Sequence, residues 1–247
     1  MDDSSDRAGQ DRFPFEHDPS PSGARWREPP REPDPASFRS RRDAGVALGQ
    51  ALSAFAQRAD VIVLALTSSS VHVANEVART LNVPLDIFLA STLTAPAHDQ
   101  LAIGAVTTGG TVVLNRELME RLRLPASVVR DAVTRARADV DRRERTLRGD
   151  RPPLDPAGLT VLLVADSVAT GAMMQSAIAA LRRRGATRVI CAIPVAPPEI
   201  CSLLRRSADD VVCLYTPKPY YGAGAWFEDF REPPLEGTRA MLERDPD

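Results

Sequence analysis

The chain has 247 residues, 43% of them hydrophobic, so it can bury one sizeable core but hardly two. Its formal net charge of −2 gives no overall attraction to nucleic acid or to an anionic membrane. No apolar run approaches the roughly 20 residues needed to span a bilayer, and the first ten residues lack the layout of a signal peptide. We therefore expect a soluble, cytoplasmic protein with neither a nucleic-acid nor a membrane partner.

The ends of the chain differ in composition from its middle. Residues 1–36 hold seven prolines, nine acidic residues and five arginines, with almost no aliphatic side chains. Such a segment cannot bury enough apolar surface to offset the entropy lost on ordering. We predict a disordered tail at residues 1–36, one folded domain at residues 37–232, and a short C-terminal tail at residues 233–247.

Within this domain, helical and strand-like patterns alternate. The continuous apolar run at residues 61–66 is typical of a parallel strand covered on both faces. Further strands are expected at residues 85–90, 160–164, 188–194 and 210–215, and helices around residues 48–55, 71–81, 126–148, 171–184 and 198–206. Gly109 and Gly110 suit the turn of a hairpin between residues 102–107 and 111–114. The predicted fold class is α/β: a doubly wound, mostly parallel sheet of about five strands, with flanking helices and a small β hairpin.

The three cysteines are an odd number without CxxC spacing, which argues against a disulfide framework or a zinc site. Cys191 and Cys213 lie in predicted strands and Cys201 in a short predicted helix, so we interpret all three as buried, reduced thiols. The arginines of residues 126–148 could form a phosphate or nucleic-acid patch. The acids at i,i+4 spacing, such as Asp139 before Arg143, favour a solvated helix face instead.

The segment that carries chemistry is Val161-Leu-Leu-Val-Ala-Asp-Ser-Val-Ala-Thr-Gly-Ala-Met-Met174. An apolar strand ends at Asp166, and Thr170-Gly171 opens a helix after a short loop. Ligands of doubly wound sheets bind beyond the carboxyl ends of strands, and a glycine turn at a helix N-terminus can cradle an anion. An acid just before such a cradle suits the hydroxyls of a phosphorylated ribose. An ordinary strand-to-helix turn is the competing interpretation.

This segment resembles the ribose-phosphate signature of type I phosphoribosyltransferases. The resemblance runs from about Phe38 to Phe230, and it is strongest to a bacterial subgroup without an assigned substrate. It implies that the ligand is phosphoribosyl pyrophosphate or another phosphorylated ribose. It also implies that Mg²⁺ is the cofactor if the protein is active, although no side chain can be named as its direct ligand. The implied ribose-phosphate residues are Asp166, Ser167, Thr170, Gly171, Ala172 and Met173. Five further segments resemble the subgroup: residues 41–45, 101–105, 113–115, 194–198 and 226–230.

The sequence departs from the family pattern where charge is handled. Ala165 stands where the family has the first acid of its pair, and Met173 stands where a threonine is expected after the turn. The pyrophosphate loop, usually Pro-Arg-Gly-Gly in this subgroup, is Thr67-Ser68-Ser69-Ser70. Ser91 and Thr92 stand where the subgroup has an Arg-Lys pair, and Gln100 stands where it has an acid. His98 fits the pattern but has no evident partner, and His72 replaces a proline.

Two functions remain open. The first is transfer of ribose 5-phosphate from phosphoribosyl pyrophosphate to an unknown acceptor stacked near Tyr220, Tyr221 or Trp226, with weak or lost activity because several groups that would neutralise pyrophosphate are missing. The second is a non-catalytic regulator or scaffold that binds a phosphosugar or a nucleotide on the same fold. A homodimer is compatible with either function.

Overall fold

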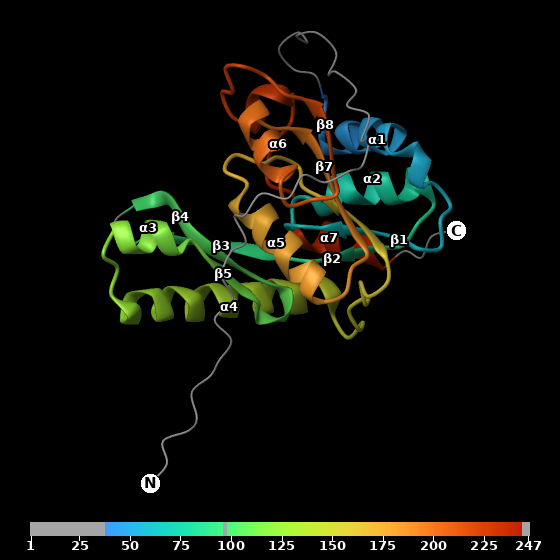
Figure 1. Cartoon of the computed structure of the whole chain (residues 1–247). Coiled ribbons are helices and arrows are strands. Elements are labelled where there is room, and N and C mark those ends of the chain that lie inside the picture. The colour runs from blue at the N-terminus through green and yellow to red at the C-terminus, as the bar shows by residue number, and fades with distance from the viewer. Residues whose placement is uncertain (1–37, 96–97, 244–247) are drawn as a thin grey trace.

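A computed structural model describes residues 38–95 and 98–243, so the tail predicted at residues 1–36 lies outside the described part (Figure 1). Five parallel strands form the main sheet in the order β2-β1-β6-β7-β8. In chain order they are β1 (Val61–Ala65), β2 (Leu85–Ile87), β6 (Thr160–Val164), β7 (Arg188–Val195) and β8 (Asp210–Tyr215). The predicted fold class is confirmed, including the strand number. The inner strands β1, β6 and β7 are buried on both faces along nearly their whole length, as parallel strands require, whereas the edge strand β8 is mostly half-buried.

Helices cover both faces of this sheet. Leu48 of α1 and Val77 of α2 lie in the core cluster on one face, whereas Met174 and Leu181 of α5 and Cys201 of α6 lie in the cluster on the other. The helices are α1 (Arg41–Ala51), α2 (Val71–Leu81), α3 (Arg116–Arg121), α4 (Ala126–Arg148), α5 (Ala172–Arg183), α6 (Pro198–Leu204) and α7 (Leu235–Leu242), with 3-10 turns at Ser53–Phe55, Thr108–Gly110 and Ala223–Trp226.

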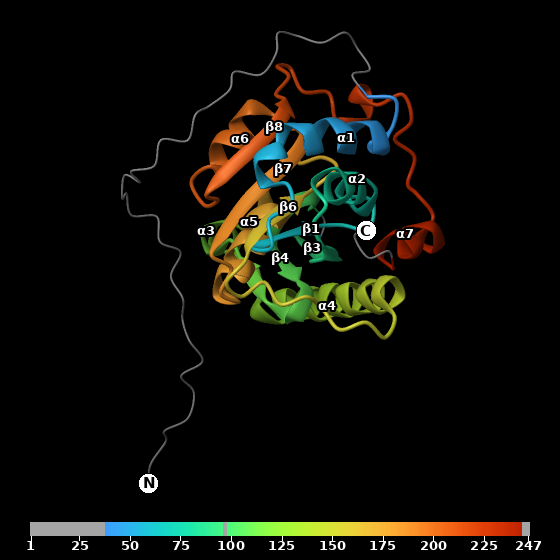
Figure 2. The same ribbon diagram turned by 90° about the vertical axis from the view of Figure 1, so that its right-hand side faces the viewer.

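Two glycines let α1 lie unusually close to α2, and Figure 2 shows the two helices side by side. A β-carbon added at Gly45 would stand 2.6 Å from the carbonyl oxygen of Val73, and one added at Gly49 would stand 2.7 Å from the β-carbon of Thr80. Both distances are shorter than real contacts allow, so these positions can hold only glycine unless the helices separate. The spacing of α1 from α2 therefore depends on the absence of two side chains.

A second, antiparallel sheet has the order β3-β4-β5, formed by β3 (Ala90–Ala95), β4 (His98–Thr107) and β5 (Val112–Leu114). It lies between α4 and α5 (Figure 1). Leu93 and Ile103 are buried there with Ala132 and Ala136 of α4. The β4–β5 turn at Gly109 and Gly110, both with positive φ, confirms the predicted hairpin.

The structure corrects the prediction of one strand at residues 85–90. The chain leaves the parallel sheet after Ile87 and enters the antiparallel sheet at Ala90. At the crossing, the N–H of Leu89 donates to Thr108 Oγ1 and the N–H of Ala90 donates to the carbonyl of Leu66. The run reads as one strand because both sheets bury their apolar residues, and periodicity cannot show where one sheet ends.

The structure also extends the fold beyond the predicted boundary at residue 232. Residues 233–247 were expected to be a tail, but they contain α7, which packs on α2 and α4. Leu242 is 2% exposed, and Arg151 donates to its carbonyl. One buried leucine and a half-buried methionine, Met241, fix a helix that is too short for its apolar pattern to predict.

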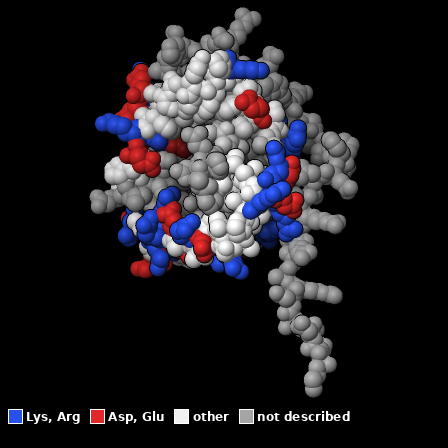
Figure 3. Space-filling view, turned by 90° about the vertical axis from the view of Figure 1, so that its left-hand side faces the viewer, with Lys and Arg blue, Asp and Glu red and all other residues white. Residues whose placement is uncertain are grey.

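The long charged helix at 126–148 is confirmed as α4. Asp139 pairs with Arg142 at 2.5 Å and with Arg143 at 2.8 Å. On the face shown in Figure 3, basic and acidic side chains are interspersed and form no single basic patch. Among the described residues, no helix combines the length and apolar character needed to cross a membrane.

We predict that the thiols differ in reactivity. All three cysteines are free, and Cys191 and Cys201 are 0% and 1% exposed, whereas Cys213 is partly exposed. Burial raises the pKa of Cys191 well above its ordinary value, and a hydrogen bond with Cys201 raises the pKa of Cys213. Because the thiolate is the reactive form, even the accessible Cys213 should react slowly. With a chromogenic disulfide reagent, we expect Cys213 to react first and Cys191 and Cys201 only after denaturant is added. Fast native labelling of all three would contradict this burial.

Candidate functional site

The strand order places the candidate site where the sheet changes direction. From β1 the chain moves to β2 on one side and later returns to β6 on the other, so β1 and β6 are neighbours at the switch point. The loops that leave such neighbouring strands diverge and open a crevice, where doubly wound folds bind ligands. Here those loops are residues 67–70 after β1 and residues 165–171 after β6.

The turn that precedes α5 has the features of an anion cradle. Gly171 adopts φ +76°, a left-handed conformation that glycine takes without strain, and no side chain caps the helix. Within the described residues, the backbone N–H groups of Ala172, Met173 and Met174 donate to no acceptor. Three free donors at the positive end of a helix dipole favour an oxyanion.

The other residues predicted around this turn have different environments. Thr170 is exposed and Ser167 partly exposed, so both hydroxyls are accessible. The side chain of Met173 packs on the core, so the position where the family has a threonine contributes only its N–H group here. Ala165 is 1% exposed and also belongs to the core.

Asp166 lies at the base of the turn and is 6% exposed. One carboxylate oxygen, Oδ2, accepts a hydrogen bond of 2.7 Å from Arg41 Nε, and the other, Oδ1, accepts one of 3.2 Å from Ser70 Oγ. The backbone N–H of Asp166 donates back to Ser70 Oγ at 3.2 Å. Both oxygens of the only acid that remains of the family's pair therefore already have protein donors.

The loop in the pyrophosphate position is closed by its own hydroxyls. Thr67 Oγ1 lies 2.6 Å from Ser70 Oγ and 3.0 Å from Ser69 Oγ, and it accepts the N–H of Ser70. Ser70 is 0% exposed. The next two N–H groups donate to carbonyls of the same loop. Of the four predicted residues, Ser68 is thus the one with a partly exposed hydroxyl outside this network, and the N–H groups of Thr67, Ser68 and Ser69 donate to no acceptor within the described residues.

Sequence analysis did not single out Arg41, yet it is the charged side chain closest to Asp166. Ser40 caps α1 by accepting from the N–H of Asp43, which places Arg41 in the first turn. Its guanidinium stacks on Phe230 at 3.9 Å, and Nη1 donates to the carbonyl of Arg231 at 2.8 Å. Arg41 stands in a segment that the resemblance highlights, but a first-turn arginine ordinarily faces solvent.

Beside Arg41, a cavity of about 410 Å³ opens between the first turns of α1 and α2 and residues 229–234. His72 lines it and shares a 3.0 Å hydrogen bond with Thr238 Oγ1. Burial lowers the pKa of His72, and the charge of Arg41 lowers it further. His72, which is half-buried, therefore joins α2 to α7.

The three aromatic residues proposed for an acceptor are placed differently. Tyr220 is half-buried near the turn, and its pKa is raised by burial and by the charge of Asp166. Trp226 stacks on Tyr215 with ring centres 6.0 Å apart, as part of the aromatic cluster that includes Phe38. Tyr221 is 81% exposed. Tyr220 is thus the aromatic side chain of the three whose environment is tied to Asp166.

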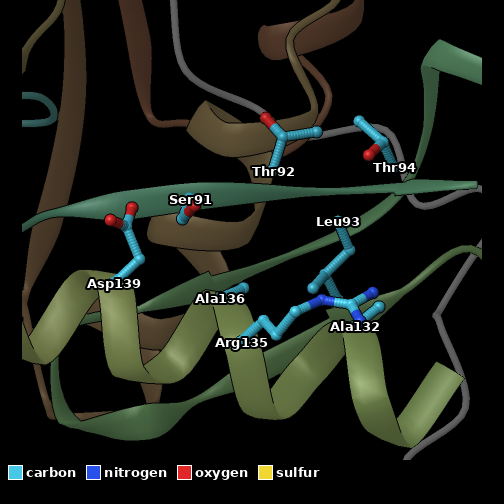
Figure 4. A pocket seen from close by; sticks show the side chains of 8 residues that line it. All are labelled: Ser91, Thr92, Leu93, Thr94, Ala132, Arg135, Ala136 and Asp139. Atoms are coloured by element: carbon cyan, nitrogen blue, oxygen red, sulfur yellow. The ribbon is translucent and has the colours of Figure 1, made fainter.

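Ser91 and Thr92 line a separate cavity of about 240 Å³ between β3 and α4. Figure 4 shows Asp139 extending toward Ser91, and Thr92 and Thr94 projecting from the strand away from α4. Among the residues that line this cavity, Arg135 is the one arginine, and there is no lysine. The side chains of His98 and Gln100 lie outside the described part of the structure.

The parallel five-stranded sheet, the small antiparallel sheet and the glycine turn before α5 at the switch point define an α/β protein with the type I phosphoribosyltransferase fold. The sequence profile of the phosphoribosyl transferase domain matches residues 42–218. The chain belongs to this family.

Two relatives agree with this assignment. Rv0571c of Mycobacterium tuberculosis, named as a candidate phosphoribosyl transferase, is 35% identical over 208 residues, which are 84% of this chain and 46% of that protein. The chain thus spans about half the length of this curated relative. The crystal structure of TT1426 from Thermus thermophilus is 36% identical with a TM-score of 0.71, and the match covers 83% of this chain and 97% of that one.

Proposed function

We propose that this chain keeps the ribose-phosphate half of a phosphoribosyltransferase site, and that its transfer of ribose 5-phosphate from phosphoribosyl pyrophosphate to an acceptor is weak or lost. The contrast between the two loops carries the proposal. Both loops have free backbone N–H groups, but the α5 turn adds the accessible hydroxyl of Thr170, whereas three of the four hydroxyls after β1 are bonded to one another. An anion at the first loop gains a hydroxyl donor directly, but an anion at the second must compete for hydroxyls that are already hydrogen-bonded.

The turn alone can hold one phosphate group. A monophosphate needs only the helix N-terminus and a hydroxyl, both of which Thr170 and Gly171 supply. Pyrophosphate carries more charge, and its departure requires that this charge be neutralised. The family generally uses Mg²⁺ together with phosphoribosyl pyrophosphate. In this chain, Ser68 stands where the subgroup has an arginine, so the pyrophosphate end has lost a cation.

We expect calorimetry to show ribose 5-phosphate binding with a Kd between about millimolar and tens of micromolar, equivalent to about −4 to −6 kcal/mol. Phosphoribosyl pyrophosphate should bind no more than about tenfold more tightly, since its pyrophosphate group meets no positively charged side chain in residues 67–70. Ser68→Arg should strengthen binding of phosphoribosyl pyrophosphate and leave that of ribose 5-phosphate unchanged, because the new charge lies only at the pyrophosphate end. Ser202→Arg, on the exposed face of α6, is the matched control for added charge.

Tight binding of phosphoribosyl pyrophosphate by the unaltered protein, with release of pyrophosphate, would contradict the proposal. If the chain binds no phosphorylated ribose, the alternative becomes the better interpretation: a scaffold that keeps the fold for a protein partner. The contacts of Asp166 favour that alternative, because both of its carboxylate oxygens accept hydrogen bonds from protein groups.

A further inference from the structure

The charge beside Asp166 comes from the protein. Arg41 reaches the carboxylate from α1, and its side chain is only 8% exposed. Three separate contacts fix the guanidinium: Asp166 Oδ2 at 2.7 Å, the carbonyl of Arg231 at 2.8 Å and the ring of Phe230 at 3.9 Å. A buried guanidinium is stable only where it is paired and hydrogen-bonded in this way, so the arrangement is built into the fold.

This arrangement does not fit a divalent cation at the same carboxylate. Oδ2 is taken by Arg41 and Oδ1 by Ser70, and the neighbouring position that carries an acid in the family is Ala165. A cation that approached Asp166 would meet the guanidinium at contact distance and be repelled. Within the described residues, no group of three or more histidines, cysteines, aspartates and glutamates is arranged to hold a metal.

The charge balance of the site points the same way. Arg41 and Asp166 neutralise one another, so the α5 turn faces an incoming phosphate with its helix dipole and free N–H groups and without a net negative charge beside it. A site with two acids would repel a phosphate until a cation arrived. With one acid already neutralised, no cation is needed.

We propose that Arg41 excludes a divalent cation from Asp166, and that the site binds a phosphorylated ribose without a metal ion. The proposal rests on the proposed function for its ligand class, but the behaviour of the metal can be tested separately. Arg41 is a positioning residue in this account, because it acts on the ligand through Asp166 and the turn.

The first experiment is calorimetric titration of ribose 5-phosphate with and without Mg²⁺. For the wild type, we expect Mg²⁺ to change the Kd by less than about twofold. Arg41→Met should bind about tenfold more weakly without Mg²⁺ and recover when Mg²⁺ is added, since the cation can then occupy the side of Asp166 that the guanidinium leaves. A wild type that gains about tenfold from Mg²⁺, or an Arg41→Met variant that loses no affinity, would overturn the proposal.

Two further variants control for folding and for charge. Arg41→Met leaves Asp166 unpaired and can destabilise the domain, whereas Arg41→Met/Asp166→Asn removes both charges together. This double variant should show no recovery with Mg²⁺, because the carboxylate is gone; recovery would overturn the proposal. Arg58→Met also removes an arginine that pairs with an aspartate, Asp60, but at an exposed position outside the site, and it should behave as wild type.

If the wild type binds no ribose 5-phosphate at all, the proposed function fails and the metal experiment still decides this inference. Mn²⁺ binding followed by electron paramagnetic resonance should detect no site at Asp166 in the wild type or in the double variant, and a gained site in Arg41→Met. Mn²⁺ bound to the wild type and lost in Asp166→Asn would refute the role of Arg41. So would an Arg41→Met variant that folds but gains no Mn²⁺.

Discussion

Replacing Thr170 with glutamate should abolish the binding of ribose 5-phosphate, with a loss of about 100-fold or more. Thr170 directly precedes Gly171 at the N-terminus of α5, and it is exposed, so the substitution should not disturb the core. A carboxylate there would face the doubly charged phosphate. At about 5 Å and an effective dielectric constant near 20, their repulsion is roughly 6 kcal/mol before screening by salt, which is comparable to the whole binding free energy.

Thr134→Glu is the matched control, because it adds the same charge at an exposed threonine of α4. It should leave the affinity within about twofold of wild type. Calorimetry gives both values, and unfolding by urea verifies that both variants are folded. Undiminished binding by Thr170→Glu would place the phosphate somewhere other than the α5 turn.

Arg148→Met should destabilise the domain by about 3–5 kcal/mol, the cost of leaving one partner of a buried ion pair behind. Arg148 Nη1 lies 2.6 Å from both carboxylate oxygens of Asp86, and the two side chains are 6% and 4% exposed. Asp86 also accepts a hydrogen bond from the N–H of Leu154, and Arg148 Nη2 donates one to the carbonyl of Ile87. The pair ties the end of α4 to the edge strand β2.

The matched control is Arg142→Met on the same helix. Arg142 pairs with Asp139 at 2.5 Å, but its side chain is 71% exposed, so its removal should cost about 0–1 kcal/mol. Urea unfolding at constant pH measures both changes. The double variant Asp86→Asn/Arg148→Met should recover part of the loss, since it leaves no unpaired charge. A loss below about 1 kcal/mol for Arg148→Met would show that water reaches Asp86.

Local patterns predicted the parts of the fold that local patterns control. The strands at 61–65 and 160–164 and the helices at 71–81 and 126–148 follow from apolar runs and from charge spacing, and the structure places them there. The break between β2 and β3 could not be predicted in this way, because both halves of the run are buried. The first half of α1 could not be predicted because it lacks an apolar pattern: it begins with Arg41 and Arg42, and its start depends on a serine cap.

The site was predicted as a set of positions and not as a set of contacts. Asp166 and Gly171 could be identified because a strand, an acid and a glycine turn follow one another in the sequence. That Asp166 is paired could not, since Arg41 is 125 residues away and Ser70 is 96 residues away. The closure of the serine loop likewise depends on hydroxyl orientations that the letters Thr-Ser-Ser-Ser leave undetermined.

The two glycines of α1 make the site sensitive to residues that never approach a ligand. Gly45 stands one helical turn after Arg41, so the depth to which the guanidinium reaches is set by how far α1 can sink against α2. A methyl group at Gly45 or Gly49, or a bulkier residue at Thr80, would push α1 away from α2. The guanidinium of Arg41 would then move out of the crevice. The position of the positive charge beside Asp166 is therefore set by steric contacts between α1 and α2, which lie outside the site itself.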